Sequence, residues 1–255
     1  MSRRSRNVLV SGAVAVAIAV SVVGVAYSAA PAPVSGGPAG VGLCATQAAA
    51  VRSSATVETL RAFGDCEIGR RLTTLHQLGG AVDAAVGLTS ADAANLSSKI
   101  SADVDGLTGL RATIDAQTRV APLKSALVQV VTGYRVYEVL VPQVRLVVAA
   151  DGELALAPHF DQLATTLAGR LPAAQAKGKD TTAAQASIDA MNTAVAHAVT
   201  LATPMPAKLL ALTPASYASG AATSVFKTAR TALTAARDEL KAAAQDARDA
   251  LTDLR

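Results

Sequence analysis

Beyond residue 44, the apolar residues of this chain recur at alternating spacings of three and four positions. That spacing is the period of one face of an α-helix, and the strict period of two expected for a strand is missing. The pattern predicts an all-α fold, an antiparallel bundle of four to five long helices with a short helical segment at its N-terminal end. The predicted helices cover 66–87, 90–117, a central stretch over 120–171, 181–202, a short turn over 207–212, and 221–254.

The central stretch is the main core candidate, because from Val136 to Ala150 apolar residues occupy nearly every face. A helix that is hydrophobic almost all round is surrounded by other helices. Pro142 lies within this stretch and removes the amide hydrogen bond back to Glu138, so the sequence predicts a kink there.

The last predicted helix, over 221–254, is the longest amphipathic one. Its apolar seam is rich in alanine and consists of Ala222, Phe226, Ala229, Leu233, Ala236, Leu240, Ala243, Ala247, Ala250 and Leu254. Charged residues flank the seam on both sides, which is typical of a coiled coil. Such a helix suits association within or between chains, and we expect it to be the principal interaction surface.

The start of the chain has the features of an export signal. Three arginines within the first six residues precede an uncharged apolar run over 8–26, and small residues follow it. This arrangement predicts a secretory signal peptide over 1–28, cleaved before Ala29. The run is also long enough, at roughly 19 residues, to remain as an uncleaved membrane anchor. Both alternatives place the rest of the chain outside the cytoplasmic membrane, because the arginines stay inside.

Composition and charge fit a folded domain that does not bind nucleic acid. Residues 29–43 are uncharged and rich in proline, glycine and alanine, which predicts a linker before one helical bundle domain over 44–255. The 255 residues are 51% hydrophobic and carry a net charge of +4. Without Arg3, Arg4 and Arg6, 20 basic residues (23 less 3) face 19 acidic ones. A domain with nearly equal numbers of basic and acidic residues has no basic stripe to neutralise the phosphates of a nucleic acid.

Cys44 and Cys66 are the only cysteines. In an exported chain two thiols are most simply one disulfide, which would attach the short N-terminal helical segment to the next helix. The alternative, a redox pair or a pair of metal ligands, has little support because no CxxC occurs and histidine is scarce.

The motifs of known catalytic chemistries are missing from the sequence. His76, His159 and His197 show no HExxH spacing, and no GxSxG, GxGxxG, GxxxxGK or EF-hand pattern occurs. We therefore predict a protein that is not an enzyme, with no catalytic, cofactor-binding or metal-binding residues and no cofactor.

A few polar residues on the central stretch remain as candidate contacts. Arg135, Glu138 and Arg145 share one helical face. They form either an ion cluster at a helix contact or a polar pocket, beside Tyr134 and Tyr137, that receives an anionic ligand or partner.

Two parts of the chain carry a resemblance to known proteins. Residues 63–68 (FGDCEI) with 70–75 (RRLTTL), and residues 134–144 (YRVYEVLVPQV), resemble stretches of exported, Ala-rich helical proteins of high-GC Gram-positive bacteria, the actinobacteria. That group is uncharacterised. The resemblance implies a helical fold and a location in the cell envelope, and it carries over no catalytic or binding residues.

Together these features predict an exported, non-enzymatic structural or interaction protein of the bacterial cell envelope. Its partner would be another protein or a second copy of the chain, bound through helices, with a membrane contact only if the N-terminal segment is uncleaved. The alternative is an extracytoplasmic ligand-binding module with an apolar cavity between helices near 134–148.

Overall fold

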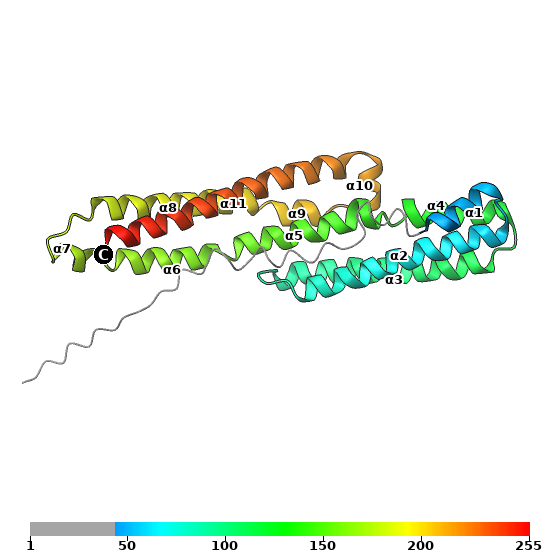
Figure 1. The fold of residues 1–255 in the computed structure, drawn as a ribbon, viewed down its shortest axis with the longest axis horizontal. Helices are drawn as coiled ribbons and strands as arrows, with labels where there is room; N and C mark the ends of the chain where they lie inside the picture. The colour runs from blue at the N-terminus through cyan, green and yellow to red at the C-terminus, as the bar shows by residue number, and fades with distance from the viewer. Residues whose placement is uncertain (1–43) are drawn as a thin grey trace, which may run out of the picture.

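The computed structural model describes residues 44–255, which form helices and no strand (Figure 1). The predicted all-α fold is confirmed. The expected signal segment over 1–28 and linker over 29–43 lie outside the described residues. Within 44–255, no helix combines the length and the hydrophobicity needed to cross a membrane.

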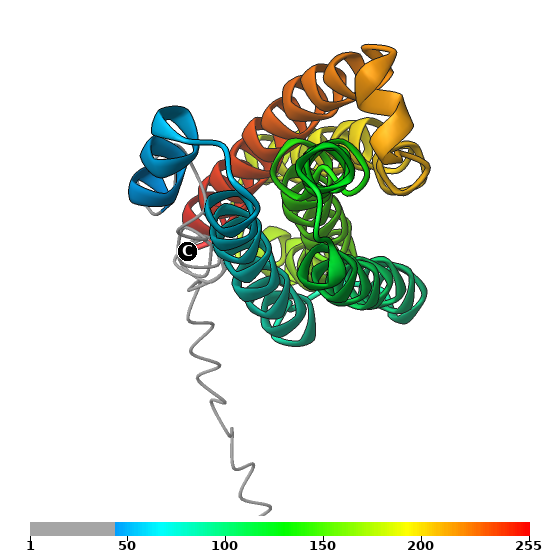
Figure 2. The same cartoon turned by 90° about the vertical axis from the view of Figure 1, so that its right-hand side faces the viewer.

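The N-terminal half of the described chain is built from α1 (Ala45–Ser53), α2 (Val57–Asp83), α3 (Ser90–Ala116) and α4 (Val120–Thr132). The helices α2, α3 and α4 pack against one another, and α1 lies on the outside beside α2 (Figure 2). Thr56 caps α2, because its hydroxyl accepts a hydrogen bond from the Thr59 amide at 3.3 Å. Thr89 caps α3 in the same way, with its hydroxyl accepting a hydrogen bond from the Asp92 amide at 3.2 Å.

The predicted disulfide is present and attaches α1 to α2. Cys44 and Cys66 are joined with their Cα atoms 5.9 Å apart. Cys44 is buried, whereas α1 contains no buried residue. Because α1 contributes so little to the core, the covalent bond is the main restraint on its position.

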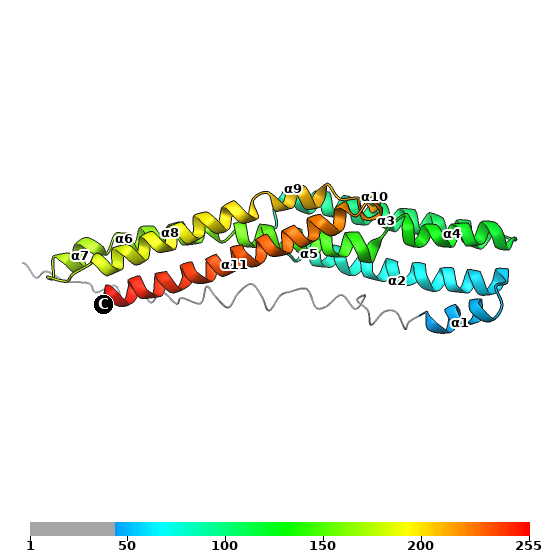
Figure 3. The same cartoon turned by 90° about the horizontal axis from the view of Figure 1, so that it is seen from above.

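The C-terminal half contains the remaining helices. They are α5 (Val141–Leu154), α6 (Ala157–Ala168), α7 (Leu171–Gln175), α8 (Thr182–Ala202), α9 (Met205–Leu210), α10 (Pro214–Ala218) and α11 (Ala221–Asp253). The longest contact is between α8 and α11, which run side by side (Figure 3). The two halves follow one another along a shared long axis, so the described part of the molecule is an elongated rod (Figures 1 and 3).

The seam predicted for the last helix is buried inside this rod. Every seam residue from Ala222 to Ala250 is buried, and Leu254 is partly buried. The small side chains allow α11 to lie close against α8, while the opposite face of α11 is polar. The seam is thus used within the chain, and the expectation that this helix is the principal surface for another chain gains no support from its apolar face.

The sequence predicted one helix over the central stretch 120–171, but the structure divides this stretch into several helices. A π-helical turn, η2 (Val136–Leu140), separates α4 from α5, and α6 and α7 follow as separate helices. Pro142, Pro158 and Pro172 lie in the first turns of α5, α6 and α7, where a missing amide costs no helical hydrogen bond. The break thus begins upstream of the kink predicted at Pro142, since η2 already departs from α-helical geometry.

Candidate functional site

The junction between the two halves contains the polar residues singled out from the sequence. α4 ends at Thr132, and Arg135 then adopts a left-handed conformation with φ 47° and ψ 42°. Among residues 44–255 it is the only residue other than glycine with a positive φ. This conformation costs roughly 1–2 kcal/mol for an L-residue, so the surrounding contacts must hold it.

Tyr134 fixes the junction to α3. Its ring lies against Gly106, where an added Cβ would stand 2.6 Å from the ring and the hydroxyl oxygen. Burial, and the nearby Asp103 carboxylate, raise the pKa of the Tyr134 hydroxyl. The ring therefore occupies space that only a glycine on α3 leaves open.

Arg135 fixes the junction to α10. Its guanidinium carbon lies 4.6 Å from the centre of the Tyr217 ring. This distance is within the range of a cation–π contact. Tyr217 is one of the few large apolar side chains left exposed, so the contact lies at the surface of the rod.

Tyr137 fixes the junction to α2. Two guanidinium groups contact its ring, with the guanidinium carbon of Arg70 at 4.6 Å and that of Arg71 at 5.3 Å from the ring centre. The Tyr137 hydroxyl and the Thr74 hydroxyl are 3.4 Å apart. One aromatic side chain thus holds a single turn of α2 through contacts along its length.

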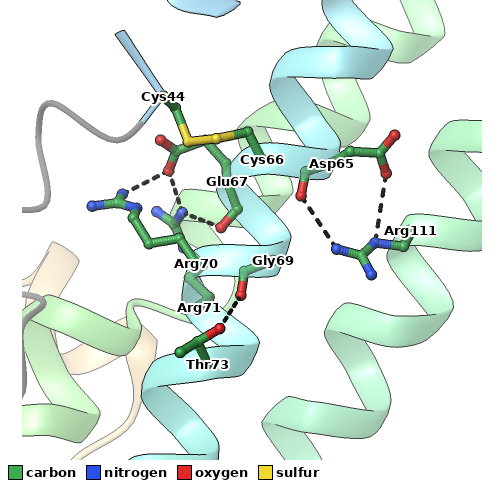
Figure 4. Close-up of a disulfide and its surroundings, with 9 residues drawn as sticks. All are labelled: Cys44, Asp65, Cys66, Glu67, Gly69, Arg70, Arg71, Thr73 and Arg111. Carbon is green, nitrogen blue, oxygen red and sulfur yellow. Dashed lines mark hydrogen bonds and ion pairs between the residues drawn. A yellow bond between two sulfur atoms is a disulfide. The ribbon is translucent and has the colours of Figure 1, made fainter.

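Glu67 orders the two arginines that hold Tyr137 (Figure 4). The carboxylate accepts a hydrogen bond from Arg70 at 2.7 Å and another from Arg71. Burial alone would raise the pKa of Glu67, but the hydrogen bonds from Arg71 and Arg70 outweigh it and lower that pKa. Glu67 follows Cys66 directly, so this cluster lies beside the disulfide.

The other two predicted contact residues do not join this arrangement. The Glu138 carboxylate has a buried oxygen, Oε2, without a hydrogen-bond partner, and Arg145 is exposed on α5. None of the ion pairs in the described part of the chain joins Arg135, Glu138 and Arg145. The shared face was inferred for a regular α-helix, and the π-helical turn and the left-handed Arg135 remove that register.

The apolar cavity proposed for the stretch 134–148 gains no support either. Its apolar side chains at Val136, Val139, Leu140, Val144 and Val147 are buried in the core. A surface hollow of about 350 Å³ lies between α2 and α3 instead, over Gly79, Gly80 and Val104. A second, of about 410 Å³, lies over the polar face of α11 between Arg230 and Asp238.

Two buried acids at the end of α5 were not predicted as site residues. Glu153 is 6% exposed, and burial raises its pKa to about 8. One carboxylate oxygen lies 3.5 Å from an Arg237 nitrogen, and the other has no hydrogen-bond partner. Asp151 is 2% exposed and accepts a hydrogen bond from the Thr89 amide at 2.9 Å. The signal available in the sequence was the presence of two acids at the end of a mostly apolar helix.

The described residues show no group of three His, Cys, Asp or Glu side chains placed to hold a metal ion. Taken together, the fold and the junction define an elongated helical rod, in which three of the five predicted contact residues, Tyr134, Arg135 and Tyr137, hold the two halves together. Comparison of the chain with protein-family models, with curated proteins and with solved structures gave no match.

Proposed function

We propose that this chain is an exported, non-enzymatic structural or interaction protein of the bacterial cell envelope. The observation that carries the proposal is the divergence of the junction side chains. Tyr134, Arg135 and Tyr137 each hold a different helix, α3, α10 and α2. A catalytic site needs polar groups that converge on one reacting atom, whereas these groups are used to stiffen a rod.

Export is supported by two independent features of the chain. The Cys44–Cys66 disulfide fits an oxidising compartment. The basic start and apolar run over 1–28 are typical of a signal peptide or anchor. Both features agree with the resemblance to exported helical proteins.

The structure limits which surfaces could contact a partner or a second copy of the chain. The apolar seam of α11 is buried against α8, so contacts between chains fall to the outer faces of the helices. These faces are mostly polar. Association through them would be reversible rather than obligate, because large obligate interfaces are more hydrophobic.

The first test is the compartment and the thiol state of the native chain. We expect a tagged full chain, produced in a high-GC Gram-positive host, outside the cytosol, with both thiols blocked to alkylation until a reductant is added. A mass beginning at Ala29 identifies cleavage, and a full-length mass in the membrane fraction identifies an anchor. A full-length chain with free thiols in the cytosol contradicts export.

The second test addresses the structural or interaction role. Chemical crosslinking of intact cells should give a discrete species larger than the monomer. The double variant Arg135→Ala/Tyr137→Ala removes the contacts of the junction with α10 and α2. It should lower the amount of the crosslinked species. Arg145→Ala, an exposed arginine of the neighbouring helix, should leave it unchanged. A chain that stays monomeric at every crosslinker concentration contradicts the proposal.

A further inference from the structure

Three of the four large apolar side chains that residues 44–255 leave exposed lie around the junction. Val128 and Val131, both on α4, are 56% and 38% exposed, and Tyr217 on α10 is 37% exposed. The fourth, Val86, belongs to the turn between α2 and α3. Apolar side chains that are exposed singly are ordinary on protein surfaces, whereas a group of them is typical of an interaction site.

These three side chains are connected through Arg135. Val128 and Val131 are three residues apart, so they are neighbours on the outer face of α4. The Arg135 amide donates a hydrogen bond to the Val131 carbonyl at 3.1 Å, and the Arg135 guanidinium lies over the Tyr217 ring. Lys124, which is exposed one turn before Val128, extends the same face. These five residues are named the junction patch.

The segments that build the junction patch carry charge of one sign. Residues 116–137 and residues 190–237 contain no acid. Their basic residues are Arg119, Lys124, Arg135, Lys208, Lys227, Arg230 and Arg237. Arg237 is paired with Glu153, and the other six form no ion pair with any residue of the described chain. The patch is thus apolar, with unpaired positive charge at its edge.

This combination favours one kind of occupant. Unpaired basic residues beside apolar ones are complementary to a surface on which acidic residues flank apolar side chains. The row formed by Val128, Val131 and Arg135 runs along α4, so a second helix can lie along it with side chains at matching spacing. Arginine and tyrosine are also among the residues that contribute most to protein interfaces.

Two other occupants fit the junction patch less well. A two-fold contact between two copies of the patch would bring Lys124 and Arg135 close to the basic residues of the other copy. A nucleic acid needs a continuous row of basic side chains to neutralise its phosphates, whereas the middle of this patch is apolar. A protein segment with acidic flanks meets neither difficulty.

We propose that the junction patch binds an acidic amphipathic helix of a partner protein. The apolar face of that helix covers Val128, Val131 and Tyr217, and its acidic residues pair with Lys124 and Arg135. This binding rests on the interaction role proposed above, and it specifies the chemistry of the partner. Because the apolar part of the patch is small, the contact is reversible.

The first measurement uses the purified, disulfide-bonded protein and a synthetic probe. The probe is a short fluorescent helical peptide with leucines on one face and glutamates on both sides of them, and a control peptide has lysines in place of the glutamates. We expect the glutamate peptide to bind in anisotropy titrations, more weakly as salt is added, and the lysine peptide not to bind. Tighter binding of the lysine peptide or of a DNA duplex contradicts the proposal, as does no binding of the glutamate peptide up to about 1 mM.

Four variants locate the binding on the surface. Val128→Asp and Lys124→Glu place negative charge in the junction patch, so each should weaken binding of the glutamate peptide by about tenfold. Both positions are exposed, and circular dichroism should show an unchanged fold. Val86→Asp and Lys177→Glu make the same changes at exposed positions outside the patch and should leave the affinity unchanged. Similar losses in all four variants, or no loss in the two patch variants, would place the binding elsewhere and overturn the proposal.

The crosslinked species in intact cells separates this proposal from the interaction role itself. We expect the double variant Lys124→Glu/Val128→Asp to lower its amount. Mass spectrometry should show the patch joined to a segment of another protein that is rich in aspartate and glutamate. A species that is unchanged in the variant, or that joins two copies of this chain at the patch, contradicts the docking of an acidic helix and leaves the interaction role standing. A chain that stays monomeric contradicts both.

Discussion

The guanidinium carbon of Arg70 lies 4.6 Å from the centre of the Tyr137 ring, and Arg71 covers the same ring from 5.3 Å. Both arginines are ordered by Glu67, which directly follows Cys66 of the disulfide. Glu67 and the arginines belong to α2, whereas Tyr137 belongs to the π-helical turn before α5. The contact therefore connects the disulfide-bonded N-terminal part of the rod to the start of its C-terminal half.

Replacing Tyr137 with alanine should destabilise the fold. The change removes a half-buried aromatic ring and two cation–π contacts, so we expect a loss of about 2–3 kcal/mol in the free energy of unfolding. Urea denaturation followed by circular dichroism measures it.

Tyr137→Phe is the matched control. It keeps the ring and removes only the hydroxyl, whose 3.4 Å contact with Thr74 is long for a hydrogen bond. Its cost should stay below about 1 kcal/mol. Equal losses in the two variants would show that the hydroxyl, and not the stacked ring, holds the junction.

Two glycines of α3 should respond to alanine in opposite directions. At Gly106 an added Cβ would lie 2.6 Å from the Tyr134 ring, so Gly106→Ala must displace the ring and should cost about 1–3 kcal/mol. At Gly109 nothing lies within 4 Å of an added Cβ. Gly109→Ala should therefore stabilise the helix by about 0.5–1 kcal/mol.

The measurement for this pair is the thermal midpoint of each variant under one set of conditions. The Gly106→Ala midpoint should fall below that of the wild type, and the Gly109→Ala midpoint should rise above it. A decrease of similar size in both would mean that the contact with the Tyr134 ring is not what makes Gly106→Ala costly.

The sequence was sufficient for the helices because their apolar faces are regular. The seam of α11 and the cap at Thr89 follow from local spacing and local hydrogen bonding. The prediction omits the first turns of α2. The apolar spacing places the start of this helix at residue 66, whereas it begins at Val57, after its Thr56 cap. Local patterns thus predicted the elements better than their ends.

The candidate site was predicted only in part, since its partners come from distant segments. The sequence singles out Tyr134, Arg135 and Tyr137 as possible contacts of a ligand or partner, and the structure shows them in contact with other helices of the chain. Their contacts on α3, α10 and α2 depend on tertiary packing, which the spacing of residues along one helix does not encode. The left-handed backbone conformation of Arg135 could not be predicted from the sequence either, because arginine has no preference for that conformation.

Removing the disulfide should loosen α1 and leave the bundle folded. α1 has no buried residue, so the double variant Cys44→Ser/Cys66→Ser removes its main restraint. The loop-entropy relation gives a loss of about 3 kcal/mol for a loop of this length. Trypsin should then cleave rapidly after the exposed Arg52, as followed by mass spectrometry of timed digests.

The control for this experiment is the wild-type protein digested with and without reductant. Reduction should reproduce the cleavage of the variant at Arg52, while α2 to α11 remain resistant. Unchanged cleavage at Arg52 on reduction would contradict the view that the disulfide, rather than packing, holds α1.

The buried carboxyl of Glu153 should make the fold less stable as the pH rises. Burial raises its pKa from 4.5 to about 8, and the arginine nitrogen at 3.5 Å does not compensate for the lost hydration. The folded state therefore holds a proton that the unfolded state releases above pH 4.5. The free energy of unfolding should decline between pH 4.5 and about 8, by on the order of 4 kcal/mol from this group.

Glu153→Gln isolates that contribution, because glutamine keeps the size of the side chain and cannot ionise. Urea unfolding at a series of pH values should show the variant more stable than the wild type at pH 8.5, with the difference shrinking towards pH 4.5. Asp161→Asn, at an exposed acid of α6, should follow the wild-type curve throughout. Parallel curves for Glu153→Gln and the wild type would mean that Glu153 remains hydrated in solution, and that α5 and α11 separate enough at this point to admit water.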